Sequence, residues 1–229
     1  MQCIETEEMS GELRPYRALI WDMDGTLLNT LDDIIGACND TLEAYGLPTL
    51  PKPEMLQLIG YGARHLCQSA SGLDGEALDR FQKDYRARAI SRDDPKTYIY
   101  PGVAETLRWA RAQGIYLGIY TNKPQAWCTK LADKFFGAGM FDTILGSTEE
   151  GLLKPDPEGI WRMCRGWGIE AESAVMIGDQ TVDFETAERA GSQHVCVSWG
   201  FRARSVLEAA GARVIVDDFE ALARVLGMR

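Results

Sequence analysis

Residues 18–27 read ALIWDMDGTL, and this stretch decides how the rest of the chain is interpreted. Its apolar start is continuous, which is typical of a strand buried on both faces of a parallel sheet. Asp22 and Asp24 follow at the end of that strand, where open α/β sheets place their binding sites. Side chains two residues apart in an extended chain point the same way, and Gly25 lets the chain turn away sharply. We therefore expect the two carboxylates to face one small volume.

Asp22 and Asp24 carry like charges, and charges held this close repel each other unless a positive group lies between them. A divalent cation is one such group, and Mg²⁺ prefers the hard oxygen ligands that carboxylates offer. A solvated Asp-Met-Asp-Gly turn at the end of the strand is the plainer alternative. A metal site therefore requires that other segments bring further acidic and phosphate-binding groups to the same edge of the sheet.

The composition of the 229 residues is that of an ordinary globular protein, with 45% apolar and 25% charged residues. A chain of this length accommodates a core domain and a smaller second domain. The net charge of −10 argues against a nucleic-acid partner, which would favour a basic surface. It also means that an anionic substrate needs local compensation from a cation and from lysines.

No apolar stretch reaches the roughly 18–20 residues that span a bilayer, so we expect no membrane association. The acidic first residues lack the apolar core of a signal peptide. The six cysteines are scattered without a C-x-x-C pair, which favours reduced thiols over disulfides or a zinc site. We therefore expect a cytoplasmic protein. The sequence leaves open whether it is a monomer or a homodimer.

Helical spacing of apolar residues follows the first strand as far as about residue 95. From Tyr100 onward, strand and helix patterns alternate, which predicts a parallel sheet with helices on both faces. The further strands are expected at residues 115–120, 141–146, 174–177, 194–197 and 214–216. The predicted fold class is therefore α/β, with an all-α insert after the first strand. We place the α/β domain at residues 1–28 and 96–229 and the helical domain at residues 29–95.

Polar residues follow three of the expected strands, and parallel strands end at the same edge of a sheet, so these residues are expected to converge. They are Asp22 and Asp24, Thr121 and Asn122, and Asp179 and Asp183. Lys154 lies in a loop that two prolines hold rigid. Each of these residues has a plainer alternative. A threonine commonly caps a helix, an isolated lysine is commonly a surface residue, and an acid in the first turn complements the helix dipole.

These segments resemble the four motifs of the haloacid dehalogenase superfamily, in the order in which that family carries them. The motifs are Asp-Met-Asp-Gly-Thr at residues 22–26, Thr-Asn at 121–122, Lys-Pro-Asp-Pro at 154–157, and the pair Asp179 and Asp183. The resemblance extends over about residues 18–216. It implies a Rossmann-like parallel sheet core and a phosphatase that uses Mg²⁺ as its cofactor.

The resemblance also implies a role for each motif residue. Asp22 would be the nucleophile, and Asp24 would be the general acid and base, in a reaction that passes through an aspartyl-phosphate. The phosphate would be bound by Thr121, Asn122 and Lys154. The metal would be held by Asp22, Asp24 through its backbone carbonyl, Asp179 and Asp183.

The helical insert resembles the smaller helical cap of phosphoglycolate phosphatase-like members of the superfamily. A cap closes over a site and selects the leaving group, so we expect a small phosphorylated metabolite as substrate. The candidate contact loop is residues 60–65. Gly62 permits close backbone approach, Arg64 could grip a substrate carboxylate, and His65 is a third candidate. The alternative is a surface arginine and an ordinary helix histidine.

Other activities are compatible with the same motifs. A phosphosugar mutase similar to β-phosphoglucomutase would transfer phosphate between sugar hydroxyls, and an inorganic pyrophosphatase would cleave pyrophosphate. A phosphate- or metal-binding sensor on the same scaffold would bind its ligand without turnover. The haloacid dehalogenases themselves need no metal and lack the second carboxylate, so Asp24 argues against that activity.

Overall fold

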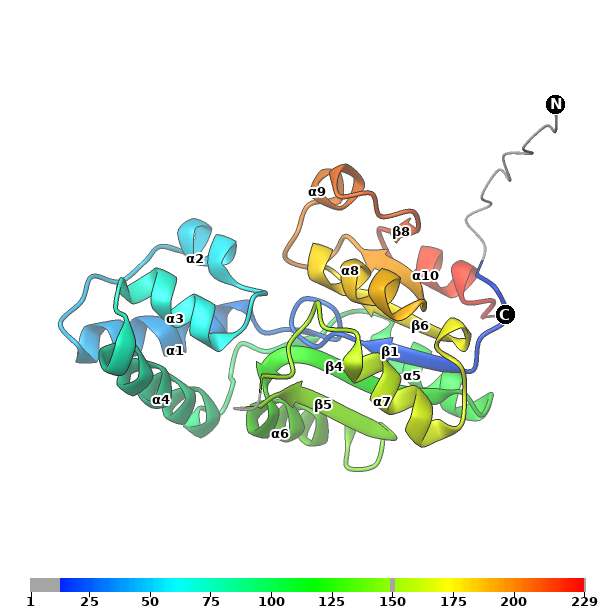
Figure 1. Cartoon of the computed structure of the whole chain (residues 1–229), viewed down its shortest axis with the longest axis horizontal. Helices are drawn as coiled ribbons and strands as arrows, with labels where there is room; N and C mark the ends of the chain where they lie inside the picture. Colours follow the sequence, from blue (N-terminus) through cyan, green and yellow to red (C-terminus); the bar gives the residue numbers. More distant parts are fainter. Residues whose placement is uncertain (1–12, 149–150, 229) are drawn as a thin grey trace.

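The computed structural model describes residues 13–148 and 151–228; residues 1–12, 149, 150 and 229 lie outside it. Its centre is a six-stranded sheet in which all neighbouring strands are parallel (Figure 1). In spatial order the strands are β5 (Thr143–Ser147), β4 (Tyr116–Pro124), β1 (Ala18–Trp21), β6 (Ala174–Gly178), β7 (Gln193–Val197) and β8 (Ile215–Val216). The predicted parallel α/β sheet is therefore confirmed.

Successive side chains of β1 point to opposite faces of the sheet, as the geometry of a strand requires. Leu19 and Trp21 belong to one hydrophobic cluster, whereas Ala18 and Ile20 belong to a second one. All four side chains are fully buried, with no exposed surface. Both faces of the sheet are covered by helices, which explains why this strand reads as an uninterrupted apolar run.

The two faces of the sheet carry different helices. The cluster of Leu19 includes buried residues of α5 (Val103–Ala112), α6 (Gln125–Phe136) and α10 (Phe219–Val225). The cluster of Ile20 includes buried residues of α7 (Glu158–Trp167) and α8 (Thr181–Ala190). A short 3₁₀ turn (η1, Ala171–Ser173) precedes β6, and α9 (Arg204–Ala209) packs beside β8.

Four helices form a separate lobe beside the sheet, at the left of Figure 1. They are α1 (Leu31–Ala44), α2 (Lys52–Leu58), α3 (Ala63–Ser71) and α4 (Gly75–Ser91). Helix α1 buries Ile34, Cys38 and Leu42, whose spacing of four residues places them on one face. Helices α1 and α3 both pack against α4. We call this lobe the cap; residues 29–95 remain the boundaries that we propose for it.

A two-stranded ladder joins the cap to the sheet, and the sequence patterns did not predict it. Strand β2 (Leu28–Asn29) pairs antiparallel with β3 (Tyr98–Ile99). The chain therefore enters and leaves the cap through two neighbouring segments. The first helix begins only at Leu31, because Leu28 and Asn29 are paired in this ladder.

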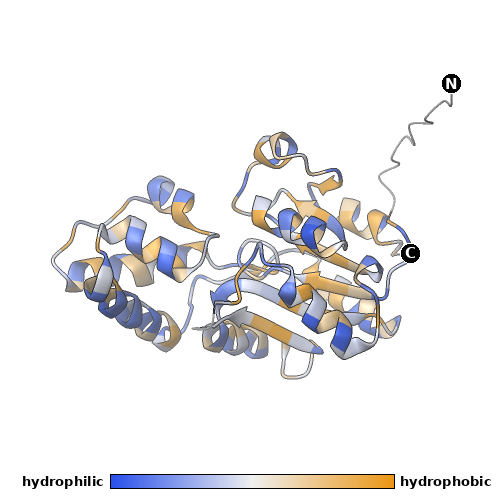
Figure 2. Cartoon of the chain, in the orientation of Figure 1, coloured by the Kyte–Doolittle hydropathy of each residue, from blue (hydrophilic) through white to orange (hydrophobic). Residues whose placement is uncertain are grey.

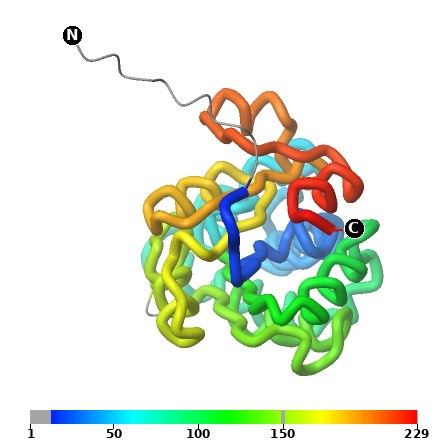
Figure 3. The backbone as a smooth tube through the Cα atoms, turned by 90° about the vertical axis from the view of Figure 1, so that its right-hand side faces the viewer, coloured from blue at the N-terminus to red at the C-terminus, as the bar shows by residue number. Residues whose placement is uncertain are grey.

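The first and last parts of the described chain lie together at the end of the sheet opposite the cap. In Figure 3 the blue start of the chain runs beside the red C-terminal segment. The Tyr16 hydroxyl donates a hydrogen bond of 2.7 Å to the carbonyl of Leu226. Apolar residues gather in and around the strands near β1, whereas the cap helices mix apolar and polar residues (Figure 2). No helix in the described ranges is both long enough and apolar enough to cross a membrane.

Candidate active site

The polar residues predicted to converge do meet at the C-terminal edge of the sheet. Asp22 directly follows β1, Asp179 directly follows β6, and Thr121 lies within the last residues of β4. The Nζ atom of Lys154 lies 2.8 Å from a carboxylate oxygen of Asp22 and 2.6 Å from one of Asp183. All five side chains are buried. Four segments that are distant in the sequence thus contribute to one cluster of charges.

Three of these acids can hold a metal ion. Asp22, Asp179 and Asp183 each offer one oxygen, and these oxygens all lie within 4.8 Å of one another. The donor set consists only of carboxylates, which suits a hard divalent cation such as Mg²⁺. Lys154 is the lysine that contacts this cluster, and it neutralises only part of its charge. The residues therefore fit the metal that the resemblance implies.

The backbone of two neighbouring segments packs closely against the Asp179 side chain. Gly25 has φ +88°, and a Cβ atom there would lie 2.4 Å from an Asp179 oxygen, so only glycine fits. The Thr26 hydroxyl and the Phe201 backbone N–H donate hydrogen bonds of 3.0 Å and 2.7 Å to the two oxygens of Asp179. Gly200 approaches equally closely, because a Cβ there would lie 2.3 Å from Asp179 Cβ. These contacts fix the carboxylate toward the cluster.

Asp183 combines the helix-start role with membership of the cluster. It lies in the first turn of α8, where one carboxylate oxygen accepts the backbone N–H of Gln180 at 2.9 Å. Its other oxygen binds the Lys154 ammonium. Asp183 therefore has the ordinary role of an acid at the start of a helix, and the same side chain also holds Lys154 in place.

Asn122 anchors the loop that carries Lys154. Its side-chain oxygen accepts the backbone N–H of Lys154 at 2.7 Å, and its Nδ2 donates to the Lys154 carbonyl at 3.1 Å. The same Nδ2 group donates to the carbonyl of Gly60, a cap residue, at 3.0 Å. The sequence predicted a phosphate-binding role for Asn122 but not this side-chain bridge between two loops and the cap.

Asp24 has a cationic partner, Lys123, which the sequence analysis did not identify. The Lys123 Nζ atom lies 2.9 Å and 3.2 Å from its two carboxylate oxygens. The Thr30 hydroxyl donates a further bond of 2.6 Å. Lys123 also lies 3.3 Å above the centre of the Trp127 ring. One signal in the sequence could have identified Lys123: it directly follows the Thr121–Asn122 motif.

The burial of these charges shifts their proton affinities. Removal from water raises the pKa of Asp22 to about 6, although the ammonium of Lys154 opposes the shift. Burial and the neighbouring carboxylates raise the pKa of Asp179 well above its usual range. The carboxylates of Asp183 and Asp22 raise the pKa of Lys154, which keeps it charged against the cost of burial. The cluster thus gains from any further positive charge.

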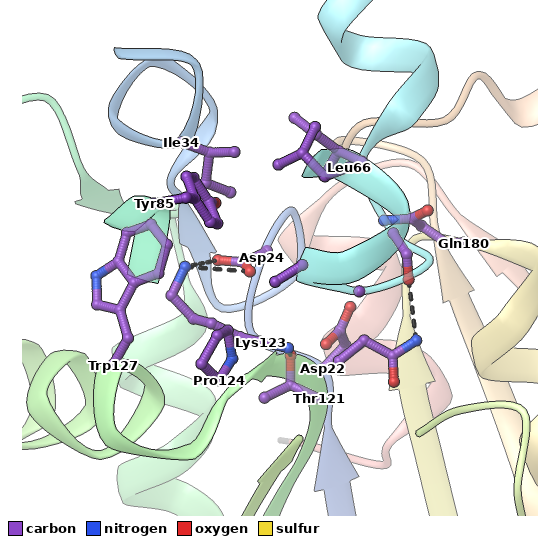
Figure 4. Close-up of a pocket in the computed structure, with 15 residues that line it drawn as sticks. Asp22, Asp24, Ile34, Leu66, Tyr85, Thr121, Lys123, Pro124, Trp127 and Gln180 are labelled. Atoms are coloured by element: carbon purple, nitrogen blue, oxygen red, sulfur yellow. Dashed lines mark hydrogen bonds and ion pairs between the residues drawn. The ribbon is translucent and has the colours of Figure 1, made fainter. Parts of the chain in front are cut away.

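A cavity of about 50 Å³ lies between the sheet edge and the cap (Figure 4). Asp22 and Thr121 line one end, Lys123 and Trp127 line the other, and Asp24 lies between them. The remaining lining residues are Ile34, Ile59, Gly60, Gly62, Ala63, Leu66, Tyr85, Asn122, Pro124 and Gln180. The cap therefore supplies much of the wall, and the volume admits only a small molecule.

The three cap candidates occupy different places. Gly62 lines the cavity and approaches Leu153 of the core. The exposed guanidinium of Arg64 pairs with Asp79 at 2.6 Å and is not among the cavity-lining residues. His65, also outside the lining, stacks on Tyr61 and contacts the Leu58 carbonyl. Of the three, only Gly62 faces the cavity in this conformation.

Core and cap contact each other directly beside the cavity. Gln180 approaches Gly60 so closely that a Cβ atom on Gly60 would lie 1.8 Å from its side-chain oxygen. The Arg202 guanidinium donates hydrogen bonds of 3.0 Å and 2.9 Å to the carbonyls of Leu56 and Ile59, at the end of α2. These contacts describe a cap that is closed over the site.

Comparison with known proteins agrees with this arrangement. The family described as "Haloacid dehalogenase-like hydrolase" matches residues 19–197. A phosphoglycolate phosphatase of Rhodospirillum rubrum is 32% identical over 223 residues, which cover 92% of this chain and 91% of the relative. One from Pseudomonas syringae pv. tomato is 29% identical and covers 90% of this chain and 78% of its own length.

A solved structure from Lactobacillus delbrueckii subsp. bulgaricus matches with a TM-score of 0.84 at 25% identity, covering 94% of this chain and 99% of that one. The family match spans well over half of the chain and includes the segments that form the acidic cluster. The chain belongs to the haloacid dehalogenase-like hydrolases, in which it is similar to the phosphoglycolate phosphatases, and it is a hydrolase of phosphoric monoesters.

Proposed function

We propose that this protein is a Mg²⁺-dependent phosphatase that hydrolyses a small phosphomonoester, such as phosphoglycolate, through an aspartyl-phosphate on Asp22. The observation that carries the proposal is the position of Asp22. Its carboxylate lines the small cavity, touches Lys154 and shares a possible metal site with two further acids. A nucleophile needs this combination of access to substrate and nearby positive charge.

The cation would be held by Asp22, Asp179 and Asp183, together with the backbone carbonyl of Asp24. When bound, Mg²⁺ supplies positive charge that favours the ionised form of Asp22 and offsets the charge of the phosphoryl group. The residues in this chain perform the remaining steps. Lys154, Thr121 and the backbone of Asn122 bind the phosphoryl oxygens and hold the phosphorus atom in line with Asp22.

In the first step a carboxylate oxygen of Asp22 attacks phosphorus, and the bond from phosphorus to the ester oxygen breaks. Asp24 gives its proton to that leaving oxygen. In the second step Asp24 takes a proton from a water molecule, which attacks the aspartyl-phosphate and releases inorganic phosphate. Asp24 lies in the middle of the cavity, where it can serve both steps. The closed cap limits the access of other water to the site.

The first test replaces the nucleophile. Asp22→Asn should lower Mg²⁺-dependent phosphate release by about three orders of magnitude or more, because the amide cannot form the acyl-phosphate. Asp218→Asn is the matched control, since Asp218 caps α10 far from the cavity and asparagine caps equally well. Retained turnover in Asp22→Asn would refute the nucleophile assignment.

A second test looks for the intermediate. Asp24→Asn should form the aspartyl-phosphate slowly and hydrolyse it more slowly still, so denatured protein should gain the mass of one phosphoryl group on Asp22. Phosphate that appears on a sugar hydroxyl instead of in water would favour a mutase. Tight phosphate binding without turnover would favour a sensor.

A further inference from the structure

The end of the cavity farthest from Asp22 contains a buried cation that the proposed chemistry does not use. Lys123 is the only lysine or arginine among the residues that line the cavity in the described part of the chain. Its side chain is 1% exposed, whereas a lysine usually keeps its ammonium in water. The protein thus holds a desolvated positive charge beside the substrate's space.

The surroundings of Lys123 fix its ammonium group in position. Asp24 contacts it from one side, and the face of the Trp127 ring supports it from another. The two oxygens of Asp24 lie 2.9 Å and 3.2 Å from the ammonium, so these contacts hold it in place as a positive charge at the wall of the cavity. Lys123 lines the cavity next to Asp24, as Figure 4 shows. A bound anion would therefore meet a preorganised positive charge.

The cap places a second donor at the same end. Tyr85 of α4 lines the cavity beside Lys123 and Ile34 and is 2% exposed (Figure 4). No other described residue makes a hydrogen bond with its hydroxyl. Burial raises the pKa of this phenol well above its usual range, so the hydroxyl keeps its proton. A buried phenol normally has a hydrogen-bond partner, and here the cavity is where one would lie.

We infer that Lys123 and Tyr85 form a subsite for an anionic group on the leaving part of the substrate, and that this group is a carboxylate. The preferred substrate is then the phosphomonoester of a short hydroxy acid. This inference rests on the proposed phosphatase function and adds the residues that recognise the leaving group.

The geometry of the cavity supports a short acid. The phosphoryl group belongs beside Asp22 and Thr121, and the ester oxygen belongs beside Asp24, which protonates it. Lys123 is in direct contact with Asp24, so a carboxylate only one or two carbon atoms from the ester oxygen comes within reach of the ammonium. The cavity of about 50 Å³ holds only a few groups the size of a water molecule. The apolar side chains of Ile34, Leu66 and Trp127 also line this cavity.

The test compares substrates within each variant, so that it does not depend on the folded fraction. The value of kcat/KM is measured from phosphate release for phosphoglycolate, for ethyl phosphate, which lacks the carboxylate, and for phosphoethanolamine, which carries a positive charge instead. The wild type should prefer phosphoglycolate to both. Lys123→Met should lower the preference over ethyl phosphate by roughly 10- to 100-fold, the loss expected for one charge-assisted hydrogen bond.

Two further variants isolate the groups involved. Tyr85→Phe removes only the hydroxyl and should lower the same preference by roughly 2- to 10-fold, as for one neutral hydrogen bond. Lys123→Arg keeps the charge and should retain preference for the acid. Lys52→Met is the control for loss of a positive charge, because exposed Lys52 pairs with Asp32 on the surface of the cap.

Three outcomes would overturn the subsite. The first is a wild type that hydrolyses ethyl phosphate as well as phosphoglycolate. The second is a Lys123→Met variant that slows both substrates equally, which would mean that Lys123 acts only by positioning Asp24. The third is a Tyr85→Phe variant whose preference for phosphoglycolate over ethyl phosphate is unchanged. This result is the decisive one if Lys123→Met is inactive. Failure of the proposed function looks different, because no phosphomonoester would then be hydrolysed by the wild type.

Discussion

At the scale of single residues, the site is organised by carboxylates that are buried, although an ionised carboxylate is more stable in water. Burial away from water raises the pKa of Asp22 and of Asp179, and repulsion from the neighbouring carboxylates adds to the shift, so both pKa values record a conflict between charge and burial. A carboxyl group whose pKa is higher in the folded protein than in the unfolded chain favours folding while it is protonated. It loses that contribution as the pH rises through its folded value. The metal-free protein is therefore expected to become less stable between about pH 4 and pH 6 through Asp22.

Asp179→Asn tests this conflict, because it removes one charge while keeping the shape of the side chain. Without metal at pH 8, the variant should melt about 2–4 °C higher than the wild type, since one like charge leaves the buried cluster. Mg²⁺ should raise the Tm of the wild type more at pH 8 than at pH 5, because protons compete with the cation for the carboxylates. The Asp179→Asn variant should lose most of the increase in Tm that Mg²⁺ gives the wild type.

Differential scanning fluorimetry with and without Mg²⁺ checks both parts of the prediction. Asp218→Asn serves again as the control and should respond to Mg²⁺ as the wild type does. An unchanged gain from Mg²⁺ in Asp179→Asn, or a gain that is independent of pH, would show that the cation binds elsewhere.

At the scale of elements, helix α6 ties the segment that leaves the cap to the strand that carries Thr121. The Trp127 ring N–H and the Lys130 ammonium donate to the two oxygens of Asp94, at 3.3 Å and 2.9 Å. Lys130 also donates to the carbonyls of Ile90 and Arg92. Asp94 is buried and has φ +48°, a left-handed conformation that aspartate and asparagine tolerate better than most residues. The return segment from the cap and the wall of the cavity are thus one connected unit.

Asp94→Asn tests this connection, because asparagine tolerates the same backbone conformation. Loss of the charge opposite half-buried Lys130 should lower the free energy of unfolding by about 1–3 kcal/mol in urea titrations. Lys130→Met and the double variant complete a thermodynamic cycle, and the two changes should not be additive. Additive effects would show that Asp94 and Lys130 do not stabilise the junction as a pair.

At the scale of the whole molecule, the site is completed only when the cap lies against the core. Gly60 accepts a hydrogen bond from Asn122 and touches Gln180, so it connects the cap to two of the segments that form the site. Its φ of +119° and its closeness to Gln180 leave no room for a side chain. Arg202 adds two hydrogen bonds from the core to the end of α2. These small contacts suit a cap that, as we propose, opens and closes during turnover.

Gly60→Ala should hold the cap away from its closed position and lower kcat/KM for small phosphomonoesters by about tenfold, equivalent to about 1.4 kcal/mol. Gly72→Ala is the matched control: Gly72 has φ +69°, so alanine is strained there too, but no atom lies within 4 Å of its added Cβ. Steady-state kinetics on both variants, with thermal melting to compare their stability, separates closure from strain. Equal losses of activity in the two variants would contradict the role of Gly60.

Part of the site could be predicted because local patterns identify strand ends. Asp22, Thr121 and Asp179 each come at the end of an apolar strand, and a parallel sheet brings such ends together. The β2–β3 ladder could not be predicted, since two-residue strands show no periodicity and their pairing joins Leu28 to Ile99 across the whole cap. Lys123 was missed because the sequence alone does not show which side of the strand end is covered by the cap.

The direction of the Arg64 side chain in the cap also could not be predicted from the sequence. Ala63 and Leu66, three residues apart on α3, face the cavity. Successive residues of a helix are rotated by about 100°, so Arg64 points elsewhere and finds Asp79. The predicted loop does line the cavity through Gly60 and Gly62, but the rotation of the helix about its axis is set by how α3 packs against α4.

The sequence by itself determined the order of strands and helices and the acidic, hydroxyl and amine groups at the sheet edge, because apolar periodicity and strand ends are local properties of the chain. Only the tertiary structure decided that Lys123, Tyr85 and Gln180 border the same cavity. Their neighbours come from segments far away in the chain, and the packing of the cap against the sheet sets those distances. In the function that we propose, the choice of substrate depends on how the two lobes meet, whereas the groups for the chemistry can be identified from the motifs.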